Sequence, residues 1–195
     1  MSLNILKTGG SLNVTKSDGS ALNKVRIELS WNADGPRAPY DFDVTALEVD
    51  QNSGQAGVGK GIETGRVCFF NQKVTPAIVH SGDSQNGAGE GVDETIRIDL
   101  SKVDPRTNLI PILVTLFEAN KRGQTFQQTN GAMCDLVNDE TNEVLARVNL
   151  PDLKAGSTAA IISAFDKSSG SWKFVAVNEG FVGKEIGDFF KIYGF

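Results

Sequence analysis

Residues 109–116, LIPILVTL, form a nearly continuous apolar run in a chain of 195 residues. Such a run is typical of a central strand whose two faces are both covered by other layers of the protein. Pro111 lies inside the run. Because proline has no backbone N–H, we expect the strand to be bulged or locally unpaired there. The run therefore predicts a layered β-structure with this strand at its centre.

Shorter segments on both sides of this run have the features of further strands. They are rich in β-branched and aromatic residues, most of them alternate apolar with polar positions, and turn signals separate them. The connections at 138–143 and 167–171 are short enough for hairpins. This pattern predicts an all-β fold, a two-sheet antiparallel β-sandwich. The expected strands cover residues 24–31, 43–49, 66–70, 95–100, 132–137, 143–150, 158–165 and 171–177.

A short C-terminal helix is expected to complete the sandwich. In residues 184–193, KEIGDFFKIY, the apolar side chains fall at helical spacing and would cap one end of the sandwich. No Pro/Ser-rich linker or low-complexity break divides the chain, so residues 1–195 are expected to form a single domain. The spaced apolar residues are Ile186, Phe189, Phe190 and Tyr193.

Charge and composition exclude several classes of protein. The net charge of −5 argues against a nucleic-acid partner. No apolar run reaches the roughly 18 residues of a transmembrane helix, and residues 1–10 are too polar for a secretion signal, so a cytoplasmic location is expected. Cys68 and Cys134 lie in apolar strand patterns and are expected to be buried free thiols. We expect no redox role for them, because reactive thiols need a basic partner that lowers their pKa.

Residues 80–94, HSGDSQNGAGEGVDE, carry the most distinctive chemistry of the chain. This stretch is rich in glycine and carboxylates, and no Lys or Arg stands between Lys73 and Arg97. Glycines let backbone carbonyls turn towards one point, and crowded carboxylates repel each other unless a cation lies among them. A hard divalent cation such as Ca²⁺ suits both features, and the alternative is a solvated acidic loop. The loop is not an EF-hand, because Ala88 occupies the position that requires glycine.

Two further segments offer oxygen ligands. Residues 40–49 read YDFDVTALEV, and on a strand Asp41 and Asp43 lie on the same face. Asn71 follows Phe69 and Phe70 at the end of another expected strand and offers a neutral amide oxygen. Placed beside the loop at 80–94, these side chains would complete a cage for the cation. Otherwise they would face water.

Together these motifs resemble the TerD family of bacterial tellurium-resistance and general-stress proteins. The resemblance rests on the order DFD (41–43), FFN (69–71), HSGD (80–83) and GAGEGVDE (87–94), followed by the long apolar strand. It extends over most of the remaining chain, through residues 1–16, 28–35, 120–150 and 169–194.

The resemblance implies a β-sandwich that binds two Ca²⁺ ions in neighbouring sites at one end. Thr45 and Val92 stand where the family has aspartates, which leaves open whether one or two sites remain, since ligand charge sets calcium affinity. Gln127 and Gln128 stand where the family usually has Gly-Gln, a change that affects a turn rather than the metal. Backbone carbonyls of Gly82, Gly87, Gly89 and Gly91 are candidates to complete the sites. The side-chain ligands carried over by position are Asp41, Asp43, Asn71, Asp83, Glu90, Asp93 and Glu94.

Catalytic interpretations fit less well. Residues 54–61 nearly match a phosphate-binding P-loop, but Gly61 replaces the Ser or Thr that binds magnesium, so a flexible loop is expected. His80 is the only histidine, and we expect it to pack beside the acidic loop and hold it by a hydrogen bond rather than to serve a nucleophile. Two cysteines and one histidine are too few for a structural zinc site. The sequence also shows no cluster of exposed aromatic residues with which a glycosidase would grip a sugar.

We therefore expect a non-enzymatic, calcium-binding stress-response protein, with the association to tellurite resistance implied by the resemblance. Ca²⁺ would order the segments at 41–45, 71 and 80–94 for a partner. The resemblance implies partners among other tellurium-resistance proteins, including a membrane component. The polar loop at 121–128, which includes Arg122, is either a solvated connection or a contact surface for a protein or an anionic ligand. The alternative function is a calcium-dependent module for carbohydrate or membrane surfaces, although loop tips of Gly, Ser, Asn and Asp argue against direct membrane insertion.

Overall fold

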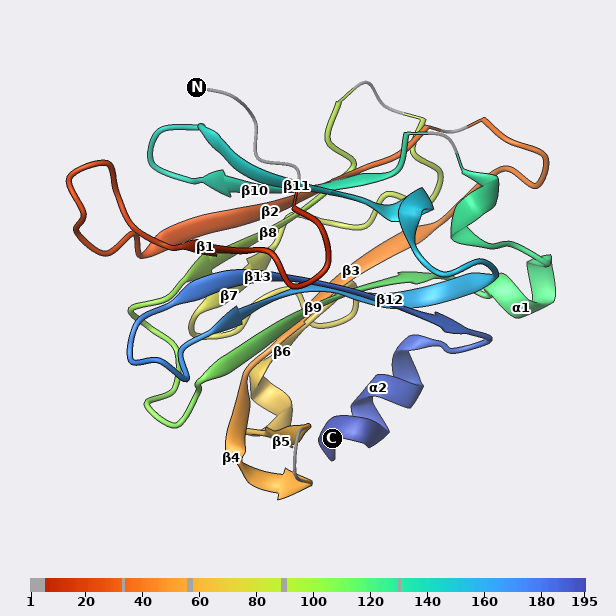
Figure 1. Ribbon diagram of the computed structural model, residues 1–195. Coiled ribbons are helices and arrows are strands. Elements are labelled where there is room, and N and C mark those ends of the chain that lie inside the picture. The colour runs from red at the N-terminus through yellow and green to blue at the C-terminus, as the bar shows by residue number, and fades with distance from the viewer. Residues whose placement is uncertain (1–5, 33, 56–57, 89–90, 130) are drawn as a thin grey trace.

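The computed structural model describes residues 6–32, 34–55, 58–88, 91–129 and 131–195, which form two antiparallel sheets packed face to face (Figure 1). The expectation of a two-sheet, all-β sandwich is therefore confirmed. The smaller sheet has the order β11 (Val144–Asn149), β10 (Met133–Asn138), β2 (Lys24–Ser30), β8 (Glu94–Asp99) and β7 (Ile78–His80). The larger sheet has the order β1 (Ser11–Asn13), β13 (Lys173–Val182), β12 (Ser157–Asp166), β9 (Leu109–Leu116), β3 (Phe42–Leu47) and β6 (Val67–Cys68), and β4 (Val49–Gln55) pairs with β9 and with β5 (Gly59–Gly61).

Strand β9 lies in the interior of the larger sheet, as its apolar run predicts. Ile110, Ile112 and Val114 face the core between the sheets, and Leu113 contributes to a second apolar cluster. Pairing of β9 with β3 ends at Ile112, immediately before Pro111, and β12 carries a bulge on the other side. Pro111 is therefore unpaired on the β3 side, as expected for a residue without a backbone N–H, although it stays in register with Ala164 of β12 on the other side.

The expected C-terminal helix is α2 (Ile186–Tyr193). Phe189 and Tyr193 are buried in the second apolar cluster with Leu47 and Leu113. In Figure 1 the helix lies against the outer face of the larger sheet rather than capping an end of the sandwich. The reason is that Leu47 of β3 and Leu113 of β9 point to the outer face of the sheet, so this part of the outer face also needs cover. None of the described helices is long and apolar enough to cross a membrane.

Short elements account for the other differences from the expected pattern. The expected strand at 66–70 joins the sheet only over β6, after the short helix η1 (Thr64–Arg66). Strands β5 and β7 are too short to give a periodic signal. A flexible loop is expected at 54–61, but the described residues of this segment belong to the hairpin that β4 and β5 form. The connections at 138–143 and 167–171 are hairpins, as expected. The remaining helical segments are α1 (Ala119–Arg122), η2 (Phe126–Gln128) and η3 (Leu150–Asp152).

Glu48 explains why the expected strand at 43–49 divides into β3 and β4. Its backbone N donates to the carbonyl of Arg66 rather than to a neighbouring strand. Its side chain is fully buried and accepts hydrogen bonds from Arg66 Nη1 at 3.1 Å, Thr107 Oγ1 at 2.8 Å and the Asp104 backbone N at 2.7 Å. This one carboxylate therefore connects the bend of the chain to two loops that are distant in sequence.

Replacing Glu48 by Gln should lower the free energy of unfolding by about 2–4 kcal/mol, because it leaves the buried side of Arg66 without its main carboxylate partner. Glu63→Gln is the matched control, since Glu63 contacts the same Arg66 at 3.5 Å but is mostly exposed. The control should change stability by less than about 0.5 kcal/mol. Urea unfolding of the two variants checks this, and equal losses would contradict it.

Candidate metal centre

Three aspartates meet where β3 begins. Phe42 and Val44 point into the core between the sheets, so Asp41 and Asp43 project together from the other face of the strand, as expected. The segment after β7 brings Asp83 to them, and one carboxylate oxygen from each of the three lies within 4.8 Å of the others. Asp41 and Asp43 are buried, whereas Asp83 is exposed. We call these three residues the acidic triad.

The acidic triad concentrates negative charge in a partly dehydrated place. Burial, together with the nearby carboxylates of Glu94, Asp41 and Asp83, raises the pKa of Asp43 to about 8. Burial and the Asp83 carboxylate raise the pKa of Asp41 to about 6, against the opposing effect of Arg122. The charged forms of both groups are therefore disfavoured in the absence of a cation. A divalent cation among them would supply the missing counter-charge.

Glu94 lies beside the triad and closes the edge of β3. Its Oε2 accepts a hydrogen bond from the Val44 backbone N at 2.9 Å, and its Oε1 accepts one from the Ser84 backbone N at 3.4 Å. Strand β6 pairs only with Ala46 and Leu47, so this carboxylate takes the place of a strand partner for Val44. The fully buried Glu94 thus fastens both β8 and the acidic loop to β3.

His80 holds the start of the acidic loop. Its Nδ1 accepts a hydrogen bond from the Gly82 backbone N at 3.1 Å, which confirms the expected link. In the neutral imidazole the proton is then on Nε2, which lies 3.4 Å from Glu94 Oε2. This Nε2 makes no hydrogen bond with the described residues, so the histidine is tied to the loop through Gly82 and does not take part in the acidic triad.

Asp93 and Gly87 shape the loop around Trp31. Asp93 Oδ2 accepts a hydrogen bond from the Trp31 backbone N at 2.9 Å, and burial raises the pKa of the Asp93 carboxyl against this bond. The indole Nε1 of Trp31 donates to the Tyr40 carbonyl at 3.0 Å. Gly87 has a φ of +57°, and a Cβ there would lie 2.2 Å from the Trp31 Nε1, so glycine is required. Both residues thus pack the loop against the strand that precedes the triad.

The remaining ligand candidates differ in exposure and backbone conformation, and two of them lie outside the described residues. Asn71 is exposed in a tight turn between Phe69 and Gln72. Gly82 and Gly91 adopt positive φ values of 142° and 97° with open space around them. Gly89 and Glu90 lie outside the residues that the structure describes. Val92, which replaces a family aspartate, is exposed.

Thr45 adds a fourth oxygen on the same face of β3. It is fully buried, and its Oγ1 has no hydrogen-bond partner among the described residues, a costly state for a buried hydroxyl. The three carboxylates form an all-oxygen donor set, and Thr45 follows Asp43 by two residues along the same face of the strand. Such a set suits a hard cation such as Ca²⁺, whereas structural zinc sites use sulfur and nitrogen ligands. The residues present therefore fit the ion that the sequence suggests.

The segment expected to be a polar loop at 121–128 is an ordered support for this end of the molecule. Gln124 is only 2% exposed, and its Nε2 donates to the carbonyls of Arg37 at 2.6 Å and Pro39 at 2.7 Å. Gln128 accepts from the Thr125 backbone N and so begins η2. Sequence reasoning missed the structural role of Gln124 and the proximity of Arg37, because both depend on contacts more than 80 residues apart in the chain.

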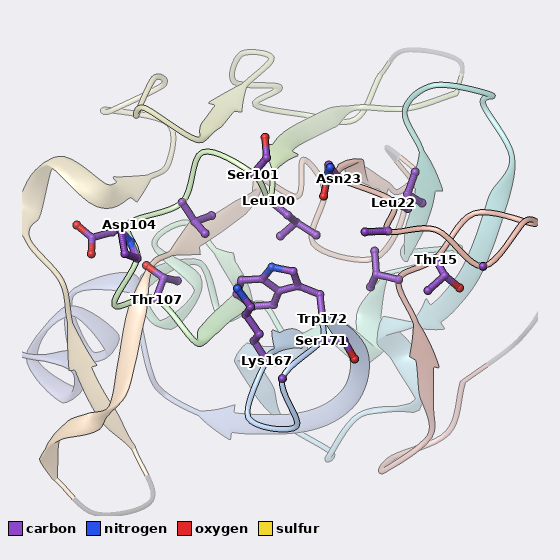
Figure 2. A pocket seen from close by; sticks show the side chains of 16 residues that line it. Thr15, Leu22, Asn23, Leu100, Ser101, Asp104, Thr107, Lys167, Ser171 and Trp172 are labelled. Carbon is purple, nitrogen blue, oxygen red and sulfur yellow. The ribbon is translucent and has the colours of Figure 1, made fainter.

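A cavity of about 610 Å³ opens around the side chain of Trp172 (Figure 2). Val14 and Leu100 line it together with the indole of Trp172. Lys167 Nζ lies over this indole, 5.5 Å from the ring centroid. Strand β9 begins beside the cavity and ends where it pairs with Phe42 next to the triad. The length of the sheet therefore separates this aromatic cavity from the acidic residues.

The two cysteines lack the features of redox-active thiols. Cys68 and Cys134 are buried and form no disulfide, as expected. Burial raises the pKa of the Cys68 thiol to about 12 and raises the pKa of Cys134 as well. Both side chains are therefore protonated and weakly nucleophilic at neutral pH.

Asp43→Asn should stabilise the metal-free protein at neutral and higher pH. The folded-state pKa of Asp43 is raised, so the folded protein binds more protons than the unfolded chain, and this contribution to stability is lost as the pH rises from about 4 to about 8. The variant has no such loss. Its advantage should therefore grow over that range to about 2 kcal/mol. Chemical unfolding in EGTA at pH 4, 6 and 8 measures this.

Asp34→Asn is the control for that experiment. Asp34 is exposed and makes no side-chain hydrogen bond with the described residues. It should therefore leave the pH dependence of the parent protein unchanged. A loss of stability in the Asp43→Asn variant at pH 8 would show that the Asp43 carboxylate of the parent protein does not destabilise the fold.

Comparison with known proteins agrees with the fold and the motifs. The TerD domain matches residues 1–193. General stress protein 16U of Bacillus subtilis (strain 168) is 33% identical over 180 residues, and tellurium resistance protein TerD of Serratia marcescens is 32% identical over 183 residues, each match covering 91% of both chains. The crystal structure of a TerD homologue, SCO6318 from Streptomyces coelicolor A3(2), shares the fold with a TM-score of 0.70 and 23% identity over 85% of this chain and 94% of that chain. The resemblance inferred from the acidic motifs is thus confirmed, and the chain belongs to the TerD domain family.

Proposed function

We propose that this protein is a non-enzymatic, calcium-binding stress-response protein with a part in tellurite resistance. The observation that carries the calcium proposal is the convergence of Asp41, Asp43 and Asp83 within 4.8 Å at a place where burial raises the pKa values of two of them. Its relatives' names, general stress protein and tellurium resistance protein, support the wider role.

The chemistry of the donors favours calcium over other divalent ions. Carboxylate, hydroxyl and carbonyl oxygens are the ligands that Ca²⁺ takes, in a flexible arrangement of six to eight. Mg²⁺ demands a nearly ideal octahedron and gives up water reluctantly, so a site assembled from a strand and a glycine-rich loop suits it less. Thr45 and the backbone carbonyls of Gly82 and Gly87 are available to add to the three carboxylates.

Bound Ca²⁺ would supply positive charge that offsets the repulsion among the carboxylates. Asp43 is fixed within β3 and Asp41 directly precedes that strand, whereas Asp83 is exposed on a loop. Drawing Asp83 towards β3 would therefore order the segment between His80 and Glu94. We infer that this ordered end of the sandwich is the surface that binds partners. The partners we propose are other tellurium-resistance proteins, including a membrane component.

Calorimetric titration of chelator-treated protein with Ca²⁺ tests this proposal. We expect one or two sites of roughly micromolar affinity and little heat with Mg²⁺. The double variant Asp43→Asn/Asp83→Asn should lose at least about 100-fold in affinity, because it removes two charged ligands.

Glu140→Gln/Glu143→Gln removes the same number of charges from exposed positions in the hairpin between β10 and β11, at the far end of β10 from its pairing with Ser30, and should bind as the parent does. Unchanged affinity in the triad variant would refute the assignment of the site. Two ions per chain in the parent would show that Thr45 and Val92 have not cost the protein its second site.

The alternative, a calcium-dependent carbohydrate or membrane module, has less support. The aromatic cavity around Trp172 is at the other end of the sheet, so a sugar bound there would not touch the calcium ligands. Near the triad the exposed Phe117 is covered on one side by the Arg122 guanidinium, 5.3 Å from the ring centroid. We expect no sedimentation with phosphatidylserine vesicles in the presence or absence of Ca²⁺. Calcium-driven sedimentation would instead favour the membrane module.

A further inference from the structure

A small cavity of about 350 Å³ adjoins the acidic triad. Asp41 forms part of its wall. Arg37 lines it from the loop before β3 and Arg122 from the end of α1, together with Gln85 and Gln124. The cavity therefore places two fixed positive charges next to the proposed calcium ligands. Neither arginine is needed to explain the metal site itself.

Arg37 is held in position by three contacts. Its backbone N donates to Tyr40 Oη at 3.1 Å, and its carbonyl accepts from Gln124 Nε2 at 2.6 Å. Its guanidinium lies over Gly123, where an added Cβ would come within 3.2 Å of Nη1. Despite this anchoring, the Arg37 guanidinium makes no hydrogen bond or ion pair with the described residues. Its donors are therefore available to a ligand.

Arg122 makes two long ion pairs but no side-chain hydrogen bond with the described residues. Its Nη1 lies 3.9 Å from Asp41 Oδ2, and its Nε lies 3.9 Å from Glu118 Oε2, both beyond hydrogen-bond distance. One face of the guanidinium lies over the Phe117 ring at 5.3 Å, which fixes its plane and leaves the edge free. A guanidinium edge with free donors is the geometry that recognises carboxylate and phosphate oxygens.

We propose that Arg37 and Arg122 form an oxyanion site that receives a carboxylate or phosphate group of a protein partner when Ca²⁺ occupies the acidic triad. This inference rests on the proposed calcium function. The partner would thus be an acidic or phosphorylated segment of a protein, and the metal and the two arginines would recognise it together.

Charge explains why the site depends on calcium. Without the cation, Asp41 presents a carboxylate to the same cavity, so an entering anion is repelled and Arg122 is drawn to Asp41. With the cation bound, the Asp41 charge is neutralised and Arg122 is free to pair with the incoming oxyanion. The cation also adds its own attraction for the ligand, because it lies next to the cavity.

The probes are three small amides, N-acetyl-phosphoserine amide, N-acetyl-aspartate amide and the neutral N-acetyl-serine amide. Their affinities for the full chain are measured by ligand-observed NMR, with Ca²⁺ and with EGTA. The first two should bind at least about tenfold more tightly with Ca²⁺, and the neutral amide should not bind. Comparing the first two probes shows whether phosphate or carboxylate is preferred.

The test variant is Arg37→Gln/Arg122→Gln. It should lose at least about tenfold in affinity for the anionic probes while its calcium affinity, measured by calorimetry, stays within about threefold of the parent. The control is Lys121→Gln/Lys184→Gln, which removes two positive charges that pair with Glu118 and Asp188 outside the cavity. It should bind the probes as the parent does.

The outcomes separate the two proposals. Calcium binding without any anion binding, or anion binding that the control variant loses equally, overturns the oxyanion site and leaves the calcium function standing. Absence of calcium binding in the parent overturns both, since the oxyanion site depends on the metal. Anion binding that is equally strong in EGTA refutes the coupling to calcium.

Discussion

The hydrogen bond from the Val44 backbone N to the buried Glu94 carboxylate is the constraint on which this end of the molecule depends. Strand β6 pairs with β3 only at Ala46 and Leu47, so the Val44 N–H has no strand partner on that edge. Because this N–H is buried, it needs another acceptor. A side chain from the opposite sheet supplies that acceptor and thereby locks the two sheets together. It also brings a carboxylate into the interior next to Asp41 and Asp43. The electrostatic strain of the acidic triad is thus a consequence of how the strand edge is closed.

The acidic loop at 80–94 is anchored in a similar way, since several of its residues have a structural partner. His80 holds Gly82, Asp93 holds the Trp31 backbone, and Gly87 allows close contact with the indole. Asp83 is the acidic residue of the described loop that is exposed and near the buried aspartates. Because these anchors fix both ends of the loop, a cation that bound Asp83 together with the buried aspartates would have only the part between them to order, which would limit the entropic cost of binding.

Much of the fold could be predicted from the sequence because hydrophobic period and turn chemistry are local signals. The run at 109–116, the alternation of the other strands and the spacing of α2 all reflect which faces must be buried. The same logic placed Asp41 and Asp43 on one face. The break at Glu48, the burial of Gln124 and the approach of Arg37 to Arg122 were not predictable. Each depends on partners far away in sequence, and a polar side chain gives no local sign that such partners exist.

The acidic triad and the two arginines form one electrostatic system because Asp41 belongs to both. Its carboxylate is a proposed ligand for a cation on one side and lies 3.9 Å from Arg122 on the other. If Ca²⁺ strengthens oxyanion binding by some factor, the oxyanion must strengthen Ca²⁺ binding by the same factor, since coupling free energies are reciprocal. A partner carrying an acidic or phosphorylated segment would therefore raise the calcium affinity of this protein. Filling of the metal site would then depend on the presence of the partner as well as on the calcium concentration.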